Sequence, residues 1–113
     1  LYVQRLGPEG RPRGAPVRVG RADGVARPAL EPCLDGLVVA TPRTFGGDYF
    51  VGINWLDAEL RQPRGEQQFY EDAHAFGQAA VACLQQRALA LVAERGELHG
   101  DGAALRAVPY DCR

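Results

Sequence analysis

The feature that most constrains the fold of this chain is an alanine-rich run from Gln67 to Arg95. Acidic residues stand near its start and arginines near its end, which suits the dipole of a helix. Apolar and small residues recur within the run at spacings of three and four: Phe69, Ala73, Phe76, Ala80, Leu84, Ala88 and Leu91. This spacing places them on one stripe of a helix, so the run predicts a long C-terminal α-helix over residues 66–96, of about eight turns.

The residues before this run are typical of short antiparallel strands joined by turns. Residues 1–6 and 48–56 alternate between two sets of side chains, as half-buried strands do, and residues 37–41 form a short apolar run. Asp35-Gly36 predicts a tight turn before that run, and the residues between it and the next strand predict a loop.

These patterns together predict an α+β fold, in which an antiparallel β-meander of four or five strands packs against one long C-terminal α-helix. The meander is expected over residues 1–60, the helix over 66–96, and a final strand and tail over 103–113. A length of 113 residues fits one domain, spanning 1–113. Because the chain begins at Leu1, we also expect that upstream sequence has been removed.

Composition excludes several classes of function. The net charge is −1, and the apolar and charged fractions of 46% and 24% are those of an average soluble domain. No nucleic acid is therefore expected as a partner, and no apolar run is long enough to span a membrane. The chain has no Ser and no Lys, and its 13 basic residues are all Arg. A serine triad, a lysine Schiff base and a lysine-dependent phosphate-binding loop are thereby excluded.

Three cysteines, Cys33, Cys83 and Cys112, are far apart in the sequence and form no close pair. A structural zinc site needs more ligands at tighter spacing, so no metal and no cofactor are expected. A disulfide from Cys112 to Cys83 or to Cys33 would tie down the end of the chain. The alternative is three reduced thiols that pack as small apolar groups. A disulfide favours an oxidising compartment, the periplasm or the exterior of the cell.

The strand-like residues 1–6, the turn over 7–14 and the returning residues 15–19 form a pattern that continues to residue 56. In this pattern the first half of the chain resembles the repeat unit of bacterial β-propeller-like proteins. The resemblance implies only a local meander, because a propeller needs several blades and this chain has strands for one at most. No functional residue is implied by it.

Candidate catalytic groups are few and isolated. Glu71 and Asp72 stand close to His74, and a carboxylate beside a histidine can act as a general base. His99 and Asp101 stand in a glycine turn that could supply two metal ligands, and Cys83 beside either histidine could act as a nucleophile. For each of these sets a structural explanation is favoured: acids at a helix start, a common turn, and a packed or bridged thiol.

Candidate binding residues are more prominent. Arginines gather in the N-terminal hairpin and the segment after it: Arg11, Arg13, Arg18, Arg21 and Arg27. They could engage a phosphate, an acidic glycan or an acidic protein, and the alternative is a solvated hairpin. The loop expected after residue 41 carries Arg43 and Phe45, a composition typical of an interface anchor, unless Phe45 folds back onto the sheet.

The sequence therefore favours a small non-enzymatic binding module of the bacterial cell envelope that binds another protein. An inhibitor or immunity-type protein is the more specific hypothesis. The partner-binding residues are expected to be Arg43, Phe45, Arg11, Arg13 and Arg18. One alternative is a small hydrolase that uses Cys83 or Asp72 with a histidine. Another is a processed domain of a larger assembly, which should leave an exposed apolar patch.

Overall fold

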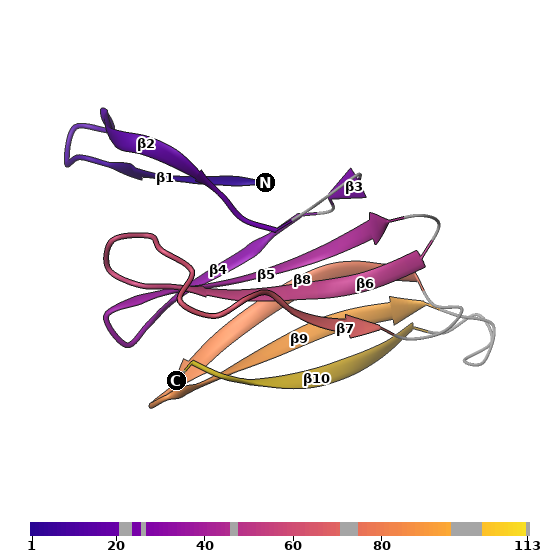
Figure 1. Ribbon diagram of the computed structural model, residues 1–113. Helices are drawn as coiled ribbons and strands as arrows, with labels where there is room; N and C mark the ends of the chain where they lie inside the picture. The colour runs from indigo at the N-terminus through magenta and orange to yellow at the C-terminus, as the bar shows by residue number, and fades with distance from the viewer. Residues whose placement is uncertain (21–23, 26, 46–47, 71–74, 96–102, 113) are drawn as a thin grey trace.

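A computed structural model shows three layers of β-structure (Figure 1). It describes residues 1–20, 24–25, 27–45, 48–70, 75–95 and 103–112. Within this part of the chain the strands form three antiparallel sheets and no helix occurs.

The first layer is an N-terminal hairpin of two strands, β1 (Tyr2–Leu6) and β2 (Pro12–Arg18). Its loop is closed by hydrogen bonds from Gly7 N to Arg11 O at 2.8 Å and from Gly10 N to Gly7 O at 2.9 Å. Gly10 has a φ of 75°, a conformation that glycine adopts without strain.

The middle layer is the central sheet, in which β5 and β6 pair along their whole length. A turn at Leu34 and Asp35 joins β4 to β5, next to the predicted turn at Asp35-Gly36. The strands of the central sheet are β3 (Gly24–Val25), β4 (Ala29–Cys33), β5 (Gly36–Phe45), β6 (Asp48–Leu56) and β7 (Gln67–Tyr70).

The third layer is the outer sheet, which consists of β8 (Ala75–Leu84), β9 (Arg87–Arg95) and β10 (Ala103–Asp111). The central strand of this sheet is β9, which pairs antiparallel with both neighbours. A two-residue turn at Gln85 and Gln86 connects β8 to β9, and Gln85 adopts a φ of 56°.

Two apolar clusters hold the layers together. The larger lies between the central and outer sheets, where Val38 and Ile53 of one sheet pack with Ala90 and Val108 of the other. The smaller contains Val19, Val39 and Leu56, with Leu1, Val3, Leu37 and Leu60 packed against it; these residues come from the hairpin, the central sheet and the connection after β6. The central sheet is therefore covered on both faces, and the outer sheet on one.

The long helix expected over residues 66–96 is wrong, and with it the α+β class. Strands β7, β8 and β9 occupy the described residues of that run. The spacing of three and four was misleading because both faces of the outer sheet are apolar, so no alternation of polar and apolar residues marks its strands. Alanine favours helices by intrinsic propensity, and the tertiary pairing of three strands overrides that preference here.

The other expected strands and the expected loop can be compared with the observed strands in the same way. The strand expected over residues 48–56 is β6 to the residue, and the strand expected over residues 1–6 is β1. The loop expected after residue 41 is wrong as far as Phe45, because β5 continues to that residue and pairs Phe45 with Asp48. A final strand is present as β10, which runs to Asp111.

Candidate functional site

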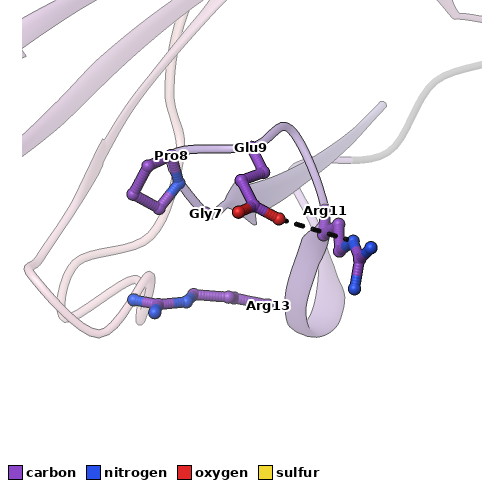
Figure 2. Close-up of a pocket in the computed structure, with 5 residues that line it drawn as sticks. All are labelled: Gly7, Pro8, Glu9, Arg11 and Arg13. Carbon is purple, nitrogen blue, oxygen red and sulfur yellow. Dashed lines mark ion pairs between the residues drawn. The ribbon is translucent and has the colours of Figure 1, made fainter.

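An open hollow of about 280 Å³ lies at the hairpin loop and is lined by Gly7, Pro8, Glu9, Arg11 and Arg13 (Figure 2). Arg11 Nε lies 3.8 Å from Glu9 Oε2, and both side chains are largely exposed. An exposed pair at this distance contributes little to stability, so both groups stay available to a ligand. The hollow thus combines guanidinium groups with a carboxylate, which partly offsets their charge.

The other hairpin arginines do not join this hollow. Arg18 is exposed at the end of β2, where its carbonyl accepts a hydrogen bond from Gln62 Nε2 at 2.8 Å. Arg27 is exposed before β4, and Arg21 lies outside the described residues. Two of the three hairpin arginines proposed as partner contacts, Arg11 and Arg13, are therefore brought together, and Arg18 stands apart.

Arg43 is buried, with 2% of its surface exposed, which is unlike the surface anchor that the sequence suggested. Its Nη2 lies 2.5 Å from Glu66 Oε2, and its Cζ lies 6.0 Å from the centre of the Phe50 ring. Glu66 also accepts hydrogen bonds from Asn54 Nδ2 and Gln68 Nε2, each at 3.0 Å. Burial lowers the pKa of Arg43, and the nearby Glu66 carboxylate opposes that shift.

Two glycines provide the space for this ion pair. A Cβ on Gly20 would meet the Arg43 guanidinium and the Glu66 carboxylate, and a Cβ on Gly52 would lie 2.6 Å from Glu66 Oε2. The pair therefore ties β5 to the segment before β7 beneath the end of the hairpin.

Phe45 lies at the end of β5, and its side chain is outside the described residues, so its role in binding stays a prediction.

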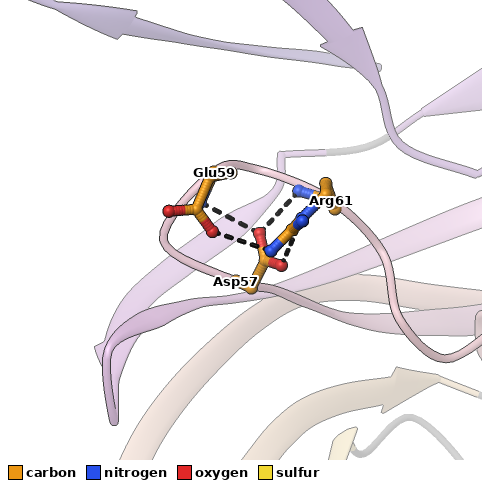
Figure 3. Close-up of polar contacts among 3 residues, drawn as sticks. All are labelled: Asp57, Glu59 and Arg61. Atoms are coloured by element: carbon orange, nitrogen blue, oxygen red, sulfur yellow. Dashed lines mark hydrogen bonds and ion pairs between the residues drawn. The ribbon is translucent and has the colours of Figure 1, made fainter.

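The connection after β6 is folded by one carboxylate (Figure 3). Asp57 Oδ1 accepts hydrogen bonds from the backbone N–H of Glu59 and of Arg61, each at 2.9 Å, and Arg61 Nε donates to Asp57 Oδ2 at 2.7 Å. Desolvation alone would raise the pKa of Asp57, but these hydrogen bonds outweigh it and lower the pKa. The loop places Leu60 against the smaller apolar cluster, so the Asp57 carboxylate helps to hold this connection in its folded position.

The outer sheet has the most unusual surface among the described residues. Its side chains that point away from the central sheet form an outer apolar face: Ala80, Ala82, Leu84, Leu89, Leu91, Ala93, Leu105, Ala107 and Pro109. The strand register aligns them in rows, in which Ala80 faces Leu91 and Leu91 faces Ala107. Leu105, Leu84 and Leu91 are 77%, 68% and 40% exposed.

A charged pair borders this face at one end. Leu84 faces Arg87 and Arg87 faces Asp111 in the strand register, so the row continues from the apolar residues into an ion pair. Arg87 Nε lies 2.9 Å from Asp111 Oδ1, and both side chains are exposed. An apolar centre with a polar, solvent-accessible rim is the usual anatomy of a protein–protein interface.

The outer apolar face was missed in the sequence, although one signal for it was present. Gln85 and Gln86 are two polar residues between two apolar segments, a length that fits a hairpin turn. Residues 79–84 and 88–93, on either side of them, are all apolar, so both faces of each strand are apolar. A run of this kind is also compatible with a buried helix, which the sequence analysis favoured.

The cysteines form a disulfide, as expected, but with a different pairing. Cys33 of β4 is bridged to Cys83 of β8, which joins the central and outer sheets. Cys112 is a buried free thiol, and the expectation that it takes part in the bridge is wrong. Burial raises the pKa of the Cys112 thiol. A disulfide is characteristic of proteins from oxidising compartments.

The catalytic groups expected from the sequence are either bridged or outside the described residues. Cys83 is bridged and is not a free nucleophile in this state. The acids and histidines proposed as general bases or ligands, Glu71, Asp72, His74, His99 and Asp101, lie outside the described residues. Among the described residues no group of three or more His, Cys, Asp or Glu side chains is arranged to hold a metal ion. This part of the chain also contains no helix long and apolar enough to cross a membrane.

Comparisons of the chain with protein-family models, with curated proteins and with solved structures found no match.

Proposed function

We propose that this protein is a non-catalytic binding module that docks on another protein through the outer apolar face. The observation that carries the proposal is the continuity of that face across β8, β9 and β10. Single exposed apolar residues are common on protein surfaces, whereas a contiguous apolar patch with a polar rim is typical of interaction sites.

The chemistry of the face defines the partner. Fully burying one leucine side chain is worth about 1.5–3 kcal/mol, and three leucines protrude here among alanines. Alanines stand beside these leucines in the strand register, which pairs Leu91 with Ala80 and Ala107 and pairs Leu105 with Ala93. A matching partner therefore presents an apolar surface, with a carboxylate or guanidinium placed to meet the rim pair of Arg87 and Asp111.

The compartment and the kind of module are part of the same proposal. The Cys33–Cys83 disulfide supports a periplasmic or extracellular location in the bacterial cell envelope. An inhibitor or immunity-type protein remains our more specific hypothesis, because the chain is small, carries a disulfide and exposes an apolar face.

The test is a capture experiment from the native envelope fraction under oxidising conditions, with matched variants. Leu105→Glu places a charge on the outer apolar face, and Leu6→Glu places the same charge on the hairpin, where Leu6 is 61% exposed. We expect the wild-type chain and the Leu6→Glu variant to retain the same partner and the Leu105→Glu variant to lose it. Thermal unfolding of all three proteins checks that each is folded.

Two outcomes would overturn the proposal. Retention of the partner by the Leu105→Glu variant would remove the outer apolar face from the interface. Sedimentation of the isolated wild-type chain as a dimer that Leu105→Glu dissociates would show that the face binds a second copy of the chain, not a different protein.

A further inference from the structure

Three cysteine sulfurs meet at one edge of the buried core, although their residues are far apart in the sequence. Cys33 and Cys83 are bridged across a separation of 50 residues. Cys112, which directly follows β10, places its Sγ 3.3 Å from Cys33 Sγ across a separation of 79 residues. One sulfur of the disulfide is therefore in contact with a free thiol.

The position of Cys112 is fixed by the backbone. Its N–H donates a hydrogen bond to Gln86 O at 3.1 Å. Gln86 lies in the turn between β8 and β9, three residues after Cys83. Cys112 is 1% exposed and Cys33 is 2% exposed, so both are enclosed by the same apolar cluster. Backbone pairing and apolar packing therefore hold the three residues together in addition to the disulfide.

The chemistry available to this arrangement is thiol–disulfide exchange. A thiolate attacks one sulfur of a disulfide and displaces the other, and a reacting distance of about 3–3.5 Å is that of a near-attack arrangement. Here Cys112 gives up its proton and bonds to Cys33 Sγ, the Cys33–Cys83 bond breaks, and Cys83 leaves as a thiolate that takes a proton. The step begins and ends with one disulfide and one thiol, so it needs no oxidant or reductant.

The two pairings differ in where the free thiol lies. Cys112 is buried, whereas Cys83 is only half-buried, at the end of β8 beside the exposed Leu84. Exchange therefore moves the reactive group from the core to a place that solvent reaches. Because burial raises the pKa of Cys112, little thiolate is present at neutral pH, and the exchange is slow compared with that of an exposed thiol.

We propose that Cys33, Cys83 and Cys112 form a thiol–disulfide exchange site, in which Cys112 replaces Cys83 as the partner of Cys33 and releases Cys83 as a thiol that reacts with external disulfides and thiol reagents. With a small disulfide the released Cys83 thiolate forms a mixed disulfide and expels the other half of that molecule as a thiolate. The site does not depend on the outer apolar face being a docking surface.

The experiment is two-step alkylation of the intact chain without reductant. The folded protein is treated for hours at neutral pH with light N-ethylmaleimide, then denatured in acid and treated with the isotopically heavy reagent. Trypsin cleaves after arginine but not before proline, so the three cysteines fall on separate peptides: 22–43, 65–87 and 107–113. Mass spectrometry without reduction then identifies the label and the bridge together.

We expect the light label on peptide 65–87, with peptide 22–43 bridged to 107–113. In Cys112→Ser the light label on peptide 65–87 should fall to background, because nothing then displaces Cys83. Two results would overturn the proposal: peptide 107–113 carrying either label while 22–43 stays bridged to 65–87, or peptide 65–87 labelled equally in Cys112→Ser.

A second variant tests the alternative bridge directly. Cys83→Ser should oxidise to a single Cys33–Cys112 disulfide and unfold cooperatively, since the two sulfurs already lie in contact. Glutathione disulfide is the probe for the mixed disulfide, and we expect it to add one glutathione to peptide 65–87 of the wild-type chain and none to that of Cys112→Ser. A Cys83→Ser protein that keeps two free thiols under air oxidation would contradict the exchange.

Discussion

The central and outer sheets share one apolar interface, but they differ in what covers their opposite faces. The far face of the central sheet lies under the hairpin and the connection after β6 (Figure 1). A buried ion pair between Arg43 and Glu66 is enclosed there. The far face of the outer sheet carries only apolar side chains over its centre, and Leu105 there is 77% exposed. The chain thus covers the face that contains charges and leaves the apolar face in water.

Solvation alone would favour the opposite arrangement, with the charged face exposed to water and the apolar face covered. Burying charged groups is costly unless they are paired, whereas burying apolar surface is favourable. The covered face of the central sheet is consistent with this rule because the Arg43 guanidinium is paired with the Glu66 carboxylate, which also accepts hydrogen bonds from Asn54 and Gln68. The exposed face of the outer sheet is consistent with it once a further surface covers the leucines, which is the physical basis for the proposed function.

The largest effect is expected where the covered face contains charge. Glu66→Ala removes the carboxylate beside Arg43, whose side chain has 0% of its surface exposed, and leaves that cation without its partner in the ion pair. Breaking one side of a buried ion pair typically costs about 3–5 kcal/mol, so we expect a loss of that size in the free energy of unfolding. Urea denaturation followed by circular dichroism measures it.

The matched control is the exposed ion pair in the connection after β6. Arg61→Ala removes the side-chain partner of Asp57, but the Arg61 side chain is 72% exposed, so solvent screens the pair and its loss should lower stability far less than the loss of Glu66 does. If Glu66→Ala cost no more than Arg61→Ala, the Arg43–Glu66 pair would not hold the covered face together.

A strand was predictable where its two faces carry different kinds of side chain, so that the sequence alternates. Residues 48–56 alternate, and β6 occupies those residues because each of its faces meets a different apolar cluster. The outer sheet was not predictable in this way. Its strands are apolar on both faces. In its turn the residue with a positive φ is Gln85, and not the glycine or asparagine from which such a turn is usually predicted.

The candidate site was predictable only in part. Exposure of the hairpin arginines follows from local turn chemistry, and the structure places Arg11 and Arg13 around one hollow. The burial of Arg43 depends on Glu66, a residue that follows a separate strand and loop, and on the hairpin end above it. Long-range contacts of this kind leave no periodic trace in the sequence, which is why Arg43 resembled a surface anchor.

A second prediction compares the same substitution on the two faces. Leu56 is 0% exposed beneath the hairpin, so Leu56→Ala should lower the free energy of unfolding by about 2–5 kcal/mol through lost burial and a residual cavity. Leu105→Ala on the outer apolar face should change it by less than about 0.5 kcal/mol, as exposed substitutions usually do. Thermal and urea unfolding of the isolated chain measure both values. A large loss for Leu105→Ala would mean that the outer apolar face is already covered within the chain.

The smallest effect concerns the glycine that lets the hairpin end approach the ion pair. Gly20 and Gly10 have similar backbone conformations, with φ of 66° and 75°, but only Gly20 has side-chain atoms where a Cβ would stand. An alanine at either position carries the cost of the left-handed conformation, which cancels when the two variants are compared. Gly20→Ala must also displace Arg43 or Glu66, so we expect it to be less stable than Gly10→Ala by about 1–3 kcal/mol in urea denaturation. Equal stabilities would show that the hairpin end can lift from the central sheet at little cost, and the covered face would then be only loosely closed.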